Sequence, residues 1–218
     1  MKKIIYRVSK RIIDIVLSSA GLVILLPVFA VIALVIKLQS PGSAIVKRKC
    51  VKRGGFYFMY KFRSMFADAD NLEKYLTREQ IDEYHRNIKV INDPRITTVG
   101  RFLRKTSLDE LPQLFNVLKG EMSLVGVRPL AEEETHLYGR ELDKMLSVKP
   151  GITGYWQTHG RSSATYENGK RKELELYYVH NQSFLLDISI LIKTLVILVT
   201  GGGVLCKNAI TRGWIYNT

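Results

Sequence analysis

The feature that most constrains this chain is an uncharged apolar run near its start. Residues 15–36 form a stretch of 22 residues without a charged side chain. At about 1.5 Å per residue, a helix of this length reaches roughly 33 Å, which is enough to cross the hydrocarbon core of a bilayer. The run therefore predicts contact with a membrane.

Three topologies compete for this run. A cleaved signal peptide would have an apolar region of about 7–15 residues, and this one is longer. A simple span has to export one of two basic flanks, against the preference of Lys and Arg for the cytoplasmic side. Pro27 lies near the middle of the run, and a proline inside a helix removes a hydrogen bond and favours a kink. A helix broken at Pro27 re-enters the same face, so we favour that topology. The two flanks are Lys2, Lys3, Arg7, Lys10 and Arg11, and then Lys37, Lys47, Arg48, Lys49, Lys52 and Arg53.

Composition narrows the class of partner. The net charge of +13 implies an anionic partner, which leaves nucleic acid, lipid headgroups and phosphorylated substrates as candidates. Hydrophobic residues make up 46% of the 218 residues, enough for a buried core, and charged residues 24%, too many for a bundle of membrane helices. The cysteines, Cys50 and Cys206, show no metal spacing or disulfide framework, as in a reducing cytoplasm.

The remaining chain predicts short elements joined by turns. Alternating aromatic residues over 56–62 predict a strand. We expect helices over 68–87, 97–105, 112–119, 131–148 and 170–181, and a short strand over 155–157. Residues 184–199 are apolar but carry Asp187 and Lys193, so either an amphipathic interfacial helix or a buried core helix fits. Asp14, beside Lys10 and Arg11, is expected to form an interfacial ion pair.

The candidate chemical centre is Ser107-Leu108-Asp109-Glu110. One interpretation is a capping box, in which Ser107 caps a helix and Glu110 bonds back to the Ser107 amide. The other is a site that handles phosphate and metal, because cations gather around the acid pair. An Asp held ionised by a helix N-terminus and nearby arginines can bind Mg²⁺ or attack phosphorus. The cations are Arg101, Arg104, Lys105, Arg128 and Arg161.

Several ordered motifs then give a resemblance. The segments are YKFRSM at 60–65, NDPRIT at 92–97, GRFLRKTSLDELPQLFNVLKG at 100–120, MSLVG at 122–126 and KPGITG at 149–154. With the basic, apolar, proline-containing start, they resemble the monotopic phosphoglycosyl transferases, the bacterial sugar transferases that begin polysaccharide or glycoprotein glycan assembly. The similarity runs from about residue 9 to about residue 200.

The resemblance implies a fold and a cellular place. The fold is α/β (α+β, mostly helical), with a re-entrant membrane helix, a small cytoplasmic catalytic domain and interfacial amphipathic helices. The expected boundaries are 1–40 for the basic start and membrane helix, 41–200 for the catalytic domain and 201–218 for a C-terminal tail. The expected location is the bacterial inner membrane, with the catalytic domain on the cytoplasmic face.

The resemblance also implies a reaction. In the family, the Asp of an Asp-Glu dyad attacks the β-phosphate of a UDP-sugar, UMP leaves, and the phosphosugar passes to polyprenyl phosphate. That dyad falls on Asp109 and Glu110, which are the expected Mg²⁺ ligands. The expected partners are the UDP-sugar, the polyprenyl phosphate and lipids of the cytoplasmic leaflet, but no nucleic acid. A homodimer is left open, and so are the sugar and the role of Glu110.

Other binding residues follow from matching positions. Arg104 is expected to bind phosphate. The family's Pro-Arg-Pro motif, associated with the uridine nucleotide, is Val127-Arg128-Pro129 here, so that Arg128 and Pro129 match while Val127 removes a fixed φ from the loop. Arg161 is a further phosphate candidate. For Lys61 and Arg63, contact with phosphate or a lipid headgroup and a solvated strand face are both open. His159 lies near a family motif without being required by it.

Three other functions compete. A membrane-tethered basic module would bind nucleic acid or anionic lipid with salt-dependent affinity and would not need the acid pair. A glycosyl transferase that moves only the sugar would release UDP instead of UMP. A scaffold without chemistry would not need an intact Asp109-Glu110 pair.

Overall fold

A computed structural model describes residues 2–87, 90, 92–160, 164, 166 and 168–200. The chain divides into two compact units, which are described separately. Unit 1 comprises Met1–Val23, Arg48–Met59 and Gln113–Thr218, and unit 2 comprises Ile24–Lys47 and Tyr60–Pro112. The expected tail over 201–218 lies outside the described residues, and the expected boundaries at 40 and 200 stay predictions.

Both units include part of one long helix, α1 (Lys2–Gln39), which contains Pro27 without an interruption in its assigned bounds. Its segment Ile4–Gln39 is long and apolar enough to cross a membrane, by length and composition only. The large apolar side chains of α1 are mostly exposed, as at Val23 (76%) and Leu38 (78%). Apolar surface on this scale marks an interaction surface. The expected re-entrant path stays a prediction.

The core of unit 2 forms around the second part of α1. Ile32 and Ile36 pack with Ala44, Phe62 and Leu103 in one buried cluster. The ring of Phe29 meets the ring of Phe62 edge to face, with centroids 5.2 Å apart. Leu103 belongs to α4 (Thr98–Thr106), whose first turn is capped by the Thr97 hydroxyl accepting from Gly100 N at 2.9 Å. This confirms the helix expected at 97–105.

The helix expected over 68–87 is wrong as a single element. The structure has α2 (Leu72–Tyr75) and α3 (Arg78–Asn87), separated at Leu76, whose backbone is extended. The break has a local cause at Thr77 and Gln80. The Thr77 hydroxyl accepts from Gln80 N at 3.3 Å, and the Gln80 side chain accepts from Thr77 N at 3.1 Å. This reciprocal cap starts a new helix.

Two strands form a hairpin that contributes to both units. β1 (Ile45–Lys52) and β2 (Gly55–Phe62) form a two-stranded sheet, which confirms the strand expected at 56–62. The turn between them contains Gly54 with φ +79°, a left-handed conformation that glycine adopts without strain.

Unit 1 is built on a short parallel pair. β3 (Ser123–Val125) pairs with β4 (Gly151–Thr153), with Ser123 opposite Gly151 and Val125 opposite Thr153. At the end of this pair, a Cβ on Gly126 would collide with the backbone of Lys149 and Gly151. The two family-like motifs at 122–126 and 149–154 therefore need glycine, because their backbones lie in direct contact.

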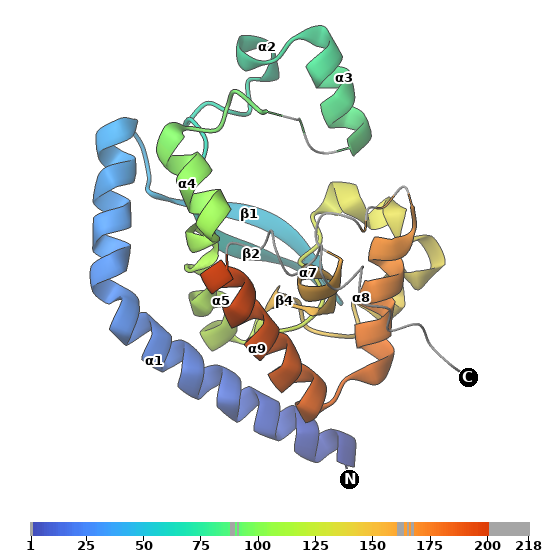
Figure 1. Ribbon diagram of the computed structural model, residues 1–218. Helices are drawn as coiled ribbons and strands as arrows, with labels where there is room; N and C mark the ends of the chain where they lie inside the picture. The colour runs from blue at the N-terminus through green and yellow to red at the C-terminus, as the bar shows by residue number, and fades with distance from the viewer. Residues whose placement is uncertain are drawn as a thin grey trace. The chain divides into compact units, whose positions relative to one another are not determined.

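Helices surround this pair in unit 1 (Figure 1). The expected helices at 112–119 and 170–181 are confirmed as α5 (Gln113–Lys119) and α8 (Lys170–Asn181). The helix expected over 131–148 is wrong as one element. It divides into the 3₁₀ helices η2 (Glu132–Leu137) and η3 (Gly139–Glu141) and then α6 (Leu142–Met145), and Gly139 has φ +52° at the junction.

The strand expected at 155–157 is also wrong, since α7 (Tyr155–His159) occupies this segment. Aromatic residues favour strands only weakly, and tertiary packing overrides that preference. Helix α7 begins directly after Gly154 and buries Trp156, whose indole Nε1 donates to Ala164 O at 3.0 Å.

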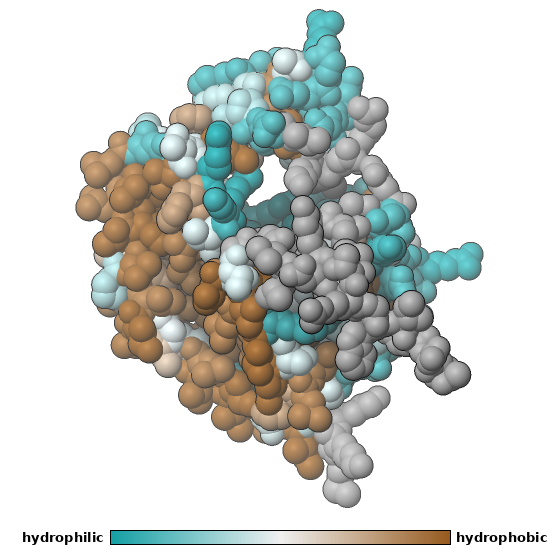
Figure 2. All heavy atoms as spheres, viewed as in Figure 1, coloured by the Kyte–Doolittle hydropathy of each residue, from teal (hydrophilic) through white to brown (hydrophobic). Residues whose placement is uncertain are grey.

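The last described helix, α9 (Phe184–Thr200), is buried along one face and exposed along the other. Asp187 and Ile190 are buried, whereas Leu185 (79%) and Val199 (87%) are exposed. The buried-core alternative for residues 184–199 is therefore wrong, and the interfacial position stays a prediction. Figure 2 shows apolar side chains gathered over α9 and the adjacent N-terminal part of α1.

A buried polar hub holds α9 to α1. The Asp187 carboxylate accepts from Lys10 Nζ at 2.6 Å, from the Tyr6 hydroxyl at 2.9 Å and from the Tyr178 hydroxyl at 2.7 Å. Asp14 was expected to form an ion pair, but its carboxylate accepts from Leu124 N at 2.9 Å instead. Because Asp14 is 4% exposed, its role is to hold β3 against α1.

Replacing Asp187 by Ala should lower the free energy of unfolding by about 3–5 kcal/mol, because it leaves the mostly buried Lys10 ammonium without its carboxylate partner. Denaturant unfolding in detergent micelles measures this difference. The exposed Asp143→Ala substitution is the matched control and should change stability by less than about 0.5 kcal/mol. Equal stabilities for the two variants would show that the hub is not a major contact.

Candidate functional site

The acid pair lies in a short 3₁₀ turn between two helices of the chain. Asp109 and Glu110 belong to η1 (Leu108–Glu110), which follows α4 directly. Ser107 has φ +58° in the left-handed region and makes no side-chain cap hydrogen bond. The capping-box interpretation is therefore wrong, since the Ser107 side chain does not cap η1 and the Ser107 amide donates to the carbonyls of Arg104 and Leu103 in α4. This leaves the acid pair for another use.

Asp109 is a buried carboxyl surrounded by charge. Only 7% of the residue is exposed. Burial raises the pKa of the Asp109 carboxyl; the Lys61 ammonium opposes this shift, Glu110 adds to it, and Arg104 opposes it. We expected the arginines and the helix start to dominate, and the direction is the reverse because desolvation is the larger effect. Perturbed carboxyls of this kind are typical of functional sites.

Glu110 is paired with a cation from β2. Lys61 Nζ lies 2.8 Å from Glu110 Oε1, and both side chains are partly exposed. The structure therefore brings Lys61, one of the candidate phosphate ligands, to the acid pair. The alternative of a solvated strand face for Lys61 does not describe this position.

Arg104 is fixed by a serine from the motif at 60–65. Its Nε donates to Ser64 Oγ at 2.8 Å, which determines the plane of the guanidinium. Ser64 is in turn held by its backbone, since its carbonyl accepts from Thr97 N at 3.1 Å. Gly100 rests on the same carbonyl, where a Cβ would clash. Sequence reasoning did not single out Ser64 or Gly100, and only the spacing of the motifs could have suggested them.

Arg63 has a different position from Lys61. It is 5% exposed, and its guanidinium donates to the carbonyls of Pro41 and, at 2.7 Å, of Ser40. These bonds fasten the chain that follows α1. Phosphate contact by Arg63 stays a prediction, but its present partners give it a structural role.

The motif Val127-Arg128-Pro129 lies in unit 1, and hydrogen bonds to other segments fix its backbone. Val127 was expected to leave its loop less rigid than proline would. However, Val127 is buried, and its carbonyl accepts from Gly151 N at 2.8 Å. Arg128 follows, with its backbone N–H directed at both oxygens of Glu175 (3.3 and 3.2 Å) and its guanidinium 5.5 Å from the Trp156 ring centroid. Pro129 completes the motif.

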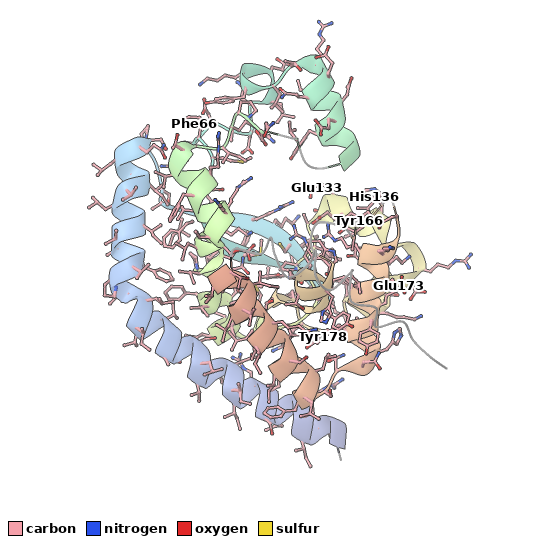
Figure 3. The ribbon with its side chains drawn as sticks, in the orientation of Figure 1. Phe66, Glu133, His136, Tyr166, Glu173 and Tyr178 are labelled. Atoms are coloured by element: carbon pink, nitrogen blue, oxygen red, sulfur yellow. The ribbon has the colours of Figure 1, made fainter. Side chains whose placement is uncertain are left out.

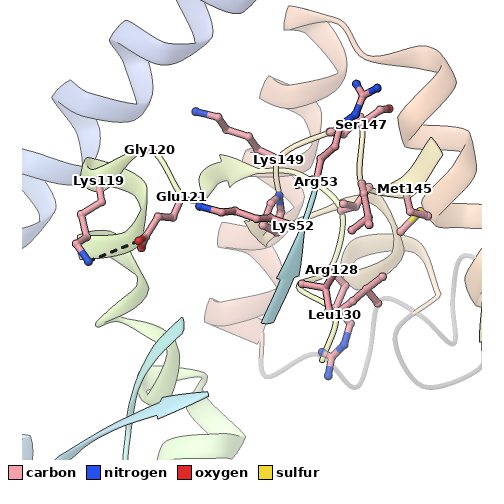
Figure 4. A pocket seen from close by; sticks show the side chains of 15 residues that line it. Lys52, Arg53, Lys119, Gly120, Glu121, Arg128, Leu130, Met145, Ser147 and Lys149 are labelled. Atoms are coloured by element: carbon pink, nitrogen blue, oxygen red, sulfur yellow. Dashed lines mark ion pairs between the residues drawn. The ribbon is translucent and has the colours of Figure 1, made fainter. Parts of the chain in front are cut away.

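A cavity of about 310 Å³ in unit 1 includes Arg128 in its lining (Figure 4). Other cations around it come from the β1–β2 turn, the end of α5 and the segment before β4; they are Lys52, Arg53, Lys119 and Lys149. The one acidic side chain of this lining, Glu121, pairs with Lys119 at 3.6 Å. An excess of positive charge suits an anionic ligand.

Two candidates remain, Arg161 and His159. Arg161 lies outside the described residues. His159 stacks on Tyr155 with centroids 3.8 Å apart, and its Nε2 is 2.5 Å from Lys193 Nζ. Burial lowers the pKa of His159, so the neutral ring can accept from the lysine.

The acid pair supplies the type of ligand atom, carboxylate oxygen, that the expected Mg²⁺ prefers. Mg²⁺ prefers oxygen ligands and is usually bound by one or two carboxylates together with substrate phosphates. Asp109 and Glu110 supply two adjacent carboxylates. The described part of the chain contains no cluster of three or more His, Cys, Asp or Glu side chains arranged for a metal, so a complete protein cage is not expected among these residues.

Comparison with known proteins agrees with the motifs. Residues 5–201 match the family described as Bacterial sugar transferase, and the chain belongs to that family. This confirms the resemblance to the bacterial phosphoglycosyl transferases, a class of transferase enzymes.

Three relatives illustrate the match. An Uncharacterized sugar transferase of Haemophilus influenzae is 41% identical over 207 residues, covering 93% of this chain and 43% of that protein. The Undecaprenyl-phosphate galactose phosphotransferase of Salmonella typhimurium is 45% identical over 192 residues, which cover 86% of this chain and 40% of that protein. The Exopolysaccharide production protein ExoY of Sinorhizobium fredii is 36% identical over 192 residues, which cover 86% of this chain and 84% of that protein. The chain thus spans about two fifths of the length of the first two.

The buried Glu175 gives a pH-dependent prediction. Burial raises its pKa to about 7 from an ordinary value near 4.5, while the Arg128 amide and the Arg171 and Arg128 charges oppose the shift. Between these two values the folded state binds more protons than the unfolded state, so stability falls as pH rises. The Glu175→Gln variant has no carboxyl group at this position, so it does not lose stability in this way as pH rises. Its melting temperature should therefore match the parent near pH 4.5 and exceed it increasingly toward pH 7.5.

Thermal unfolding at a series of pH values measures the difference. The exposed Glu173→Gln substitution makes the same chemical change at the surface of the same helix and serves as the control. A Glu175→Gln difference that shrinks as pH rises would contradict the prediction.

Proposed function

We propose that the protein transfers a sugar 1-phosphate from a UDP-sugar to a polyprenyl phosphate, such as undecaprenyl phosphate, and releases UMP. The observation that carries the proposal is the buried Asp109 carboxyl beside Lys61, Glu110 and Arg104, in a chain of the bacterial sugar transferase family. The relative from Salmonella typhimurium is named for the transfer of a galactose phosphate to undecaprenyl phosphate.

The first half-reaction forms a covalent intermediate. A carboxylate oxygen of Asp109 attacks the β-phosphorus of the UDP-sugar, and the bond from that phosphorus to the bridging oxygen of UMP breaks. The electron pair leaves with UMP, and the sugar phosphate stays on Asp109 as an acyl phosphate. Desolvation favours this step, because a carboxylate without its water shell is a better nucleophile.

Cations near the acid pair reduce the electrostatic repulsion between the attacking carboxylate and the phosphoryl group. Arg104 presents a planar guanidinium whose orientation Ser64 fixes, a geometry suited to phosphate oxygens. Lys61 neutralises Glu110 and keeps its ammonium beside Asp109. When bound by Asp109 and Glu110, Mg²⁺ would further neutralise the diphosphate oxygens. Arg128 is proposed to contact the uridine nucleotide, as its motif implies.

The second half-reaction returns the enzyme to its starting state. An oxygen of the polyprenyl phosphate attacks the phosphorus of the acyl phosphate, the bond to Asp109 breaks, and the product is a lipid diphosphate sugar. The acceptor stays in the bilayer, so the site has to work at the membrane surface. We propose that α1 re-enters the cytoplasmic leaflet at Pro27 and that the exposed apolar face of α9 lies at the same interface.

The direct test is UMP release by the purified protein in nanodiscs with Mg²⁺, undecaprenyl phosphate and a panel of UDP-sugars. UDP-galactose, UDP-glucose and UDP-N-acetylgalactosamine form the first panel. We expect lipid-dependent UMP turnover with one donor, and a loss of at least about a thousandfold in Asp109→Asn, because the amide is not a nucleophile. Removal of Mg²⁺ with a chelator should also stop turnover.

Other products would decide between the alternatives. Release of UDP would identify a glycosyl transferase that moves only the sugar. UMP release that is unchanged in Asp109→Asn would contradict the assignment of the nucleophile. Salt-dependent retention of nucleic acid, without turnover of any donor, would support the basic binding module.

A second prediction concerns Ser64. Ser64→Ala removes the acceptor for Arg104 Nε, and a hydrogen bond to a charged group contributes about 1.5–3 kcal/mol. We therefore expect kcat/KM for the donor to fall by roughly 10- to 100-fold. The exposed Ser43→Ala substitution is the control and should leave kcat/KM unchanged. A kcat/KM in Ser64→Ala equal to that of the control would show that Arg104 does not depend on this bond.

A further inference from the structure

Helix α8 presents a buried carboxyl that the proposed reaction does not use. Glu175 has no exposed surface, so it cannot touch a substrate. Its two oxygens accept from the backbone N–H of Arg128 at 3.3 and 3.2 Å. A buried carboxylate is costly unless something in the structure needs it. The hydrogen-bond partner of Glu175 is the backbone of the loop that carries Arg128.

A second residue, one helical turn earlier, contacts the same indole ring as Arg128. Arg171 is 9% exposed, and its guanidinium lies 4.4 Å from the Trp156 ring centroid and 3.9 Å from that of Tyr166. The Arg128 guanidinium contacts the same indole at 5.5 Å. Residues i and i+4 lie on one face of a helix, and both Arg171 and Glu175 interact electrostatically with Arg128. In Figure 3, Tyr166 lies beside α8, the orange helix.

The charges of this cluster explain why a carboxylate is present. Two guanidiniums share one indole, and each disfavours the charge of the other; Arg128 opposes the charge of Arg171. Glu175 faces both and offsets this repulsion, and Glu134 lies 3.7 Å from Arg171 Nη2. Without Glu175, the Arg128 backbone would lose an acceptor and its side chain would lose the balancing charge.

We infer that Glu175 is a positioning residue for donor recognition, which holds Arg128 where it meets the uridine diphosphate part of the substrate. The inference rests on the proposed function, because it takes Arg128 as a donor contact. It concerns the nucleotide and not the lipid phosphate. Glu175 should therefore affect the half-reaction that consumes the UDP-sugar and spare the one that consumes the acceptor.

Steady-state kinetics of a two-step mechanism separate these half-reactions. With Glu175→Ala, kcat/KM for the UDP-sugar should fall roughly 10- to 100-fold, as expected for loss of a charge-assisted hydrogen bond. The kcat/KM for undecaprenyl phosphate should stay within about threefold, because that step starts from the covalent enzyme without nucleotide. Glu175→Gln keeps an acceptor oxygen and should show a smaller donor defect. The exposed Glu173→Gln is the control.

Each other outcome has a defined meaning. Equal losses for donor and acceptor would indicate a smaller folded fraction and overturn the inference, and so would no loss for either. If the parent protein released no UMP, the proposed function would fail on its own. Calorimetric titration with UDP would then decide the inference, with weaker binding by Glu175→Ala than by the parent supporting it. Equal binding, or none by the parent, would overturn it.

Discussion

Helix α1 exposes apolar side chains and at the same time contributes side chains to the interiors of both units, and the structure of both units depends on these contacts. Most of its large apolar side chains are exposed, yet its polar side chains enter protein interiors. In unit 1, Lys10 reaches Asp187, Arg11 donates to the carbonyls of Val117 and Leu118 at the end of α5, and Asp14 holds β3. Each of these bonds joins a polar side chain of α1 to a partly buried group elsewhere in unit 1.

The same helix builds the interior of unit 2 by a different kind of contact. Ile32 and Ile36 are part of its main apolar cluster, and Arg63 fastens the chain just beyond the helix. That cluster also contains Leu103 of α4, the helix that carries Arg104. The position of a proposed phosphate ligand therefore depends on packing against an apolar helix that looks, from its sequence, like a simple anchor.

Sequence reasoning succeeded where the signal was local and failed where it depended on distant contacts. The capped helix at 97–105 and the strand at 56–62 followed from residues within the segment itself. The single helix over 131–148 failed because Gly139 adopts a left-handed backbone, which the sequence permits without requiring. The segment 155–157 failed because packing of Trp156 outweighs the strand preference of aromatic residues.

The same distinction applies to the site. Asp109, Glu110 and Arg104 were found through a motif, and the structure brings Lys61 to them. Ser64, Gly100 and Glu175 were missed because their partners are 40, 36 and 47 residues away. The raised pKa of Asp109 could not be foreseen either, because desolvation depends on what covers a side chain and not on its neighbours in sequence.

The shared use of α1 also determines how far this protein can be reduced. A chain starting at residue 41 would keep every proposed catalytic residue, and by motif content it would resemble a complete water-soluble enzyme. However, it would leave Asp187 without Lys10, the last carbonyls of α5 without Arg11, and the Phe62–Leu103 cluster open to water. Helix α1 is thus not a tether that can be removed to obtain a soluble catalyst, because it forms part of the interior of both units.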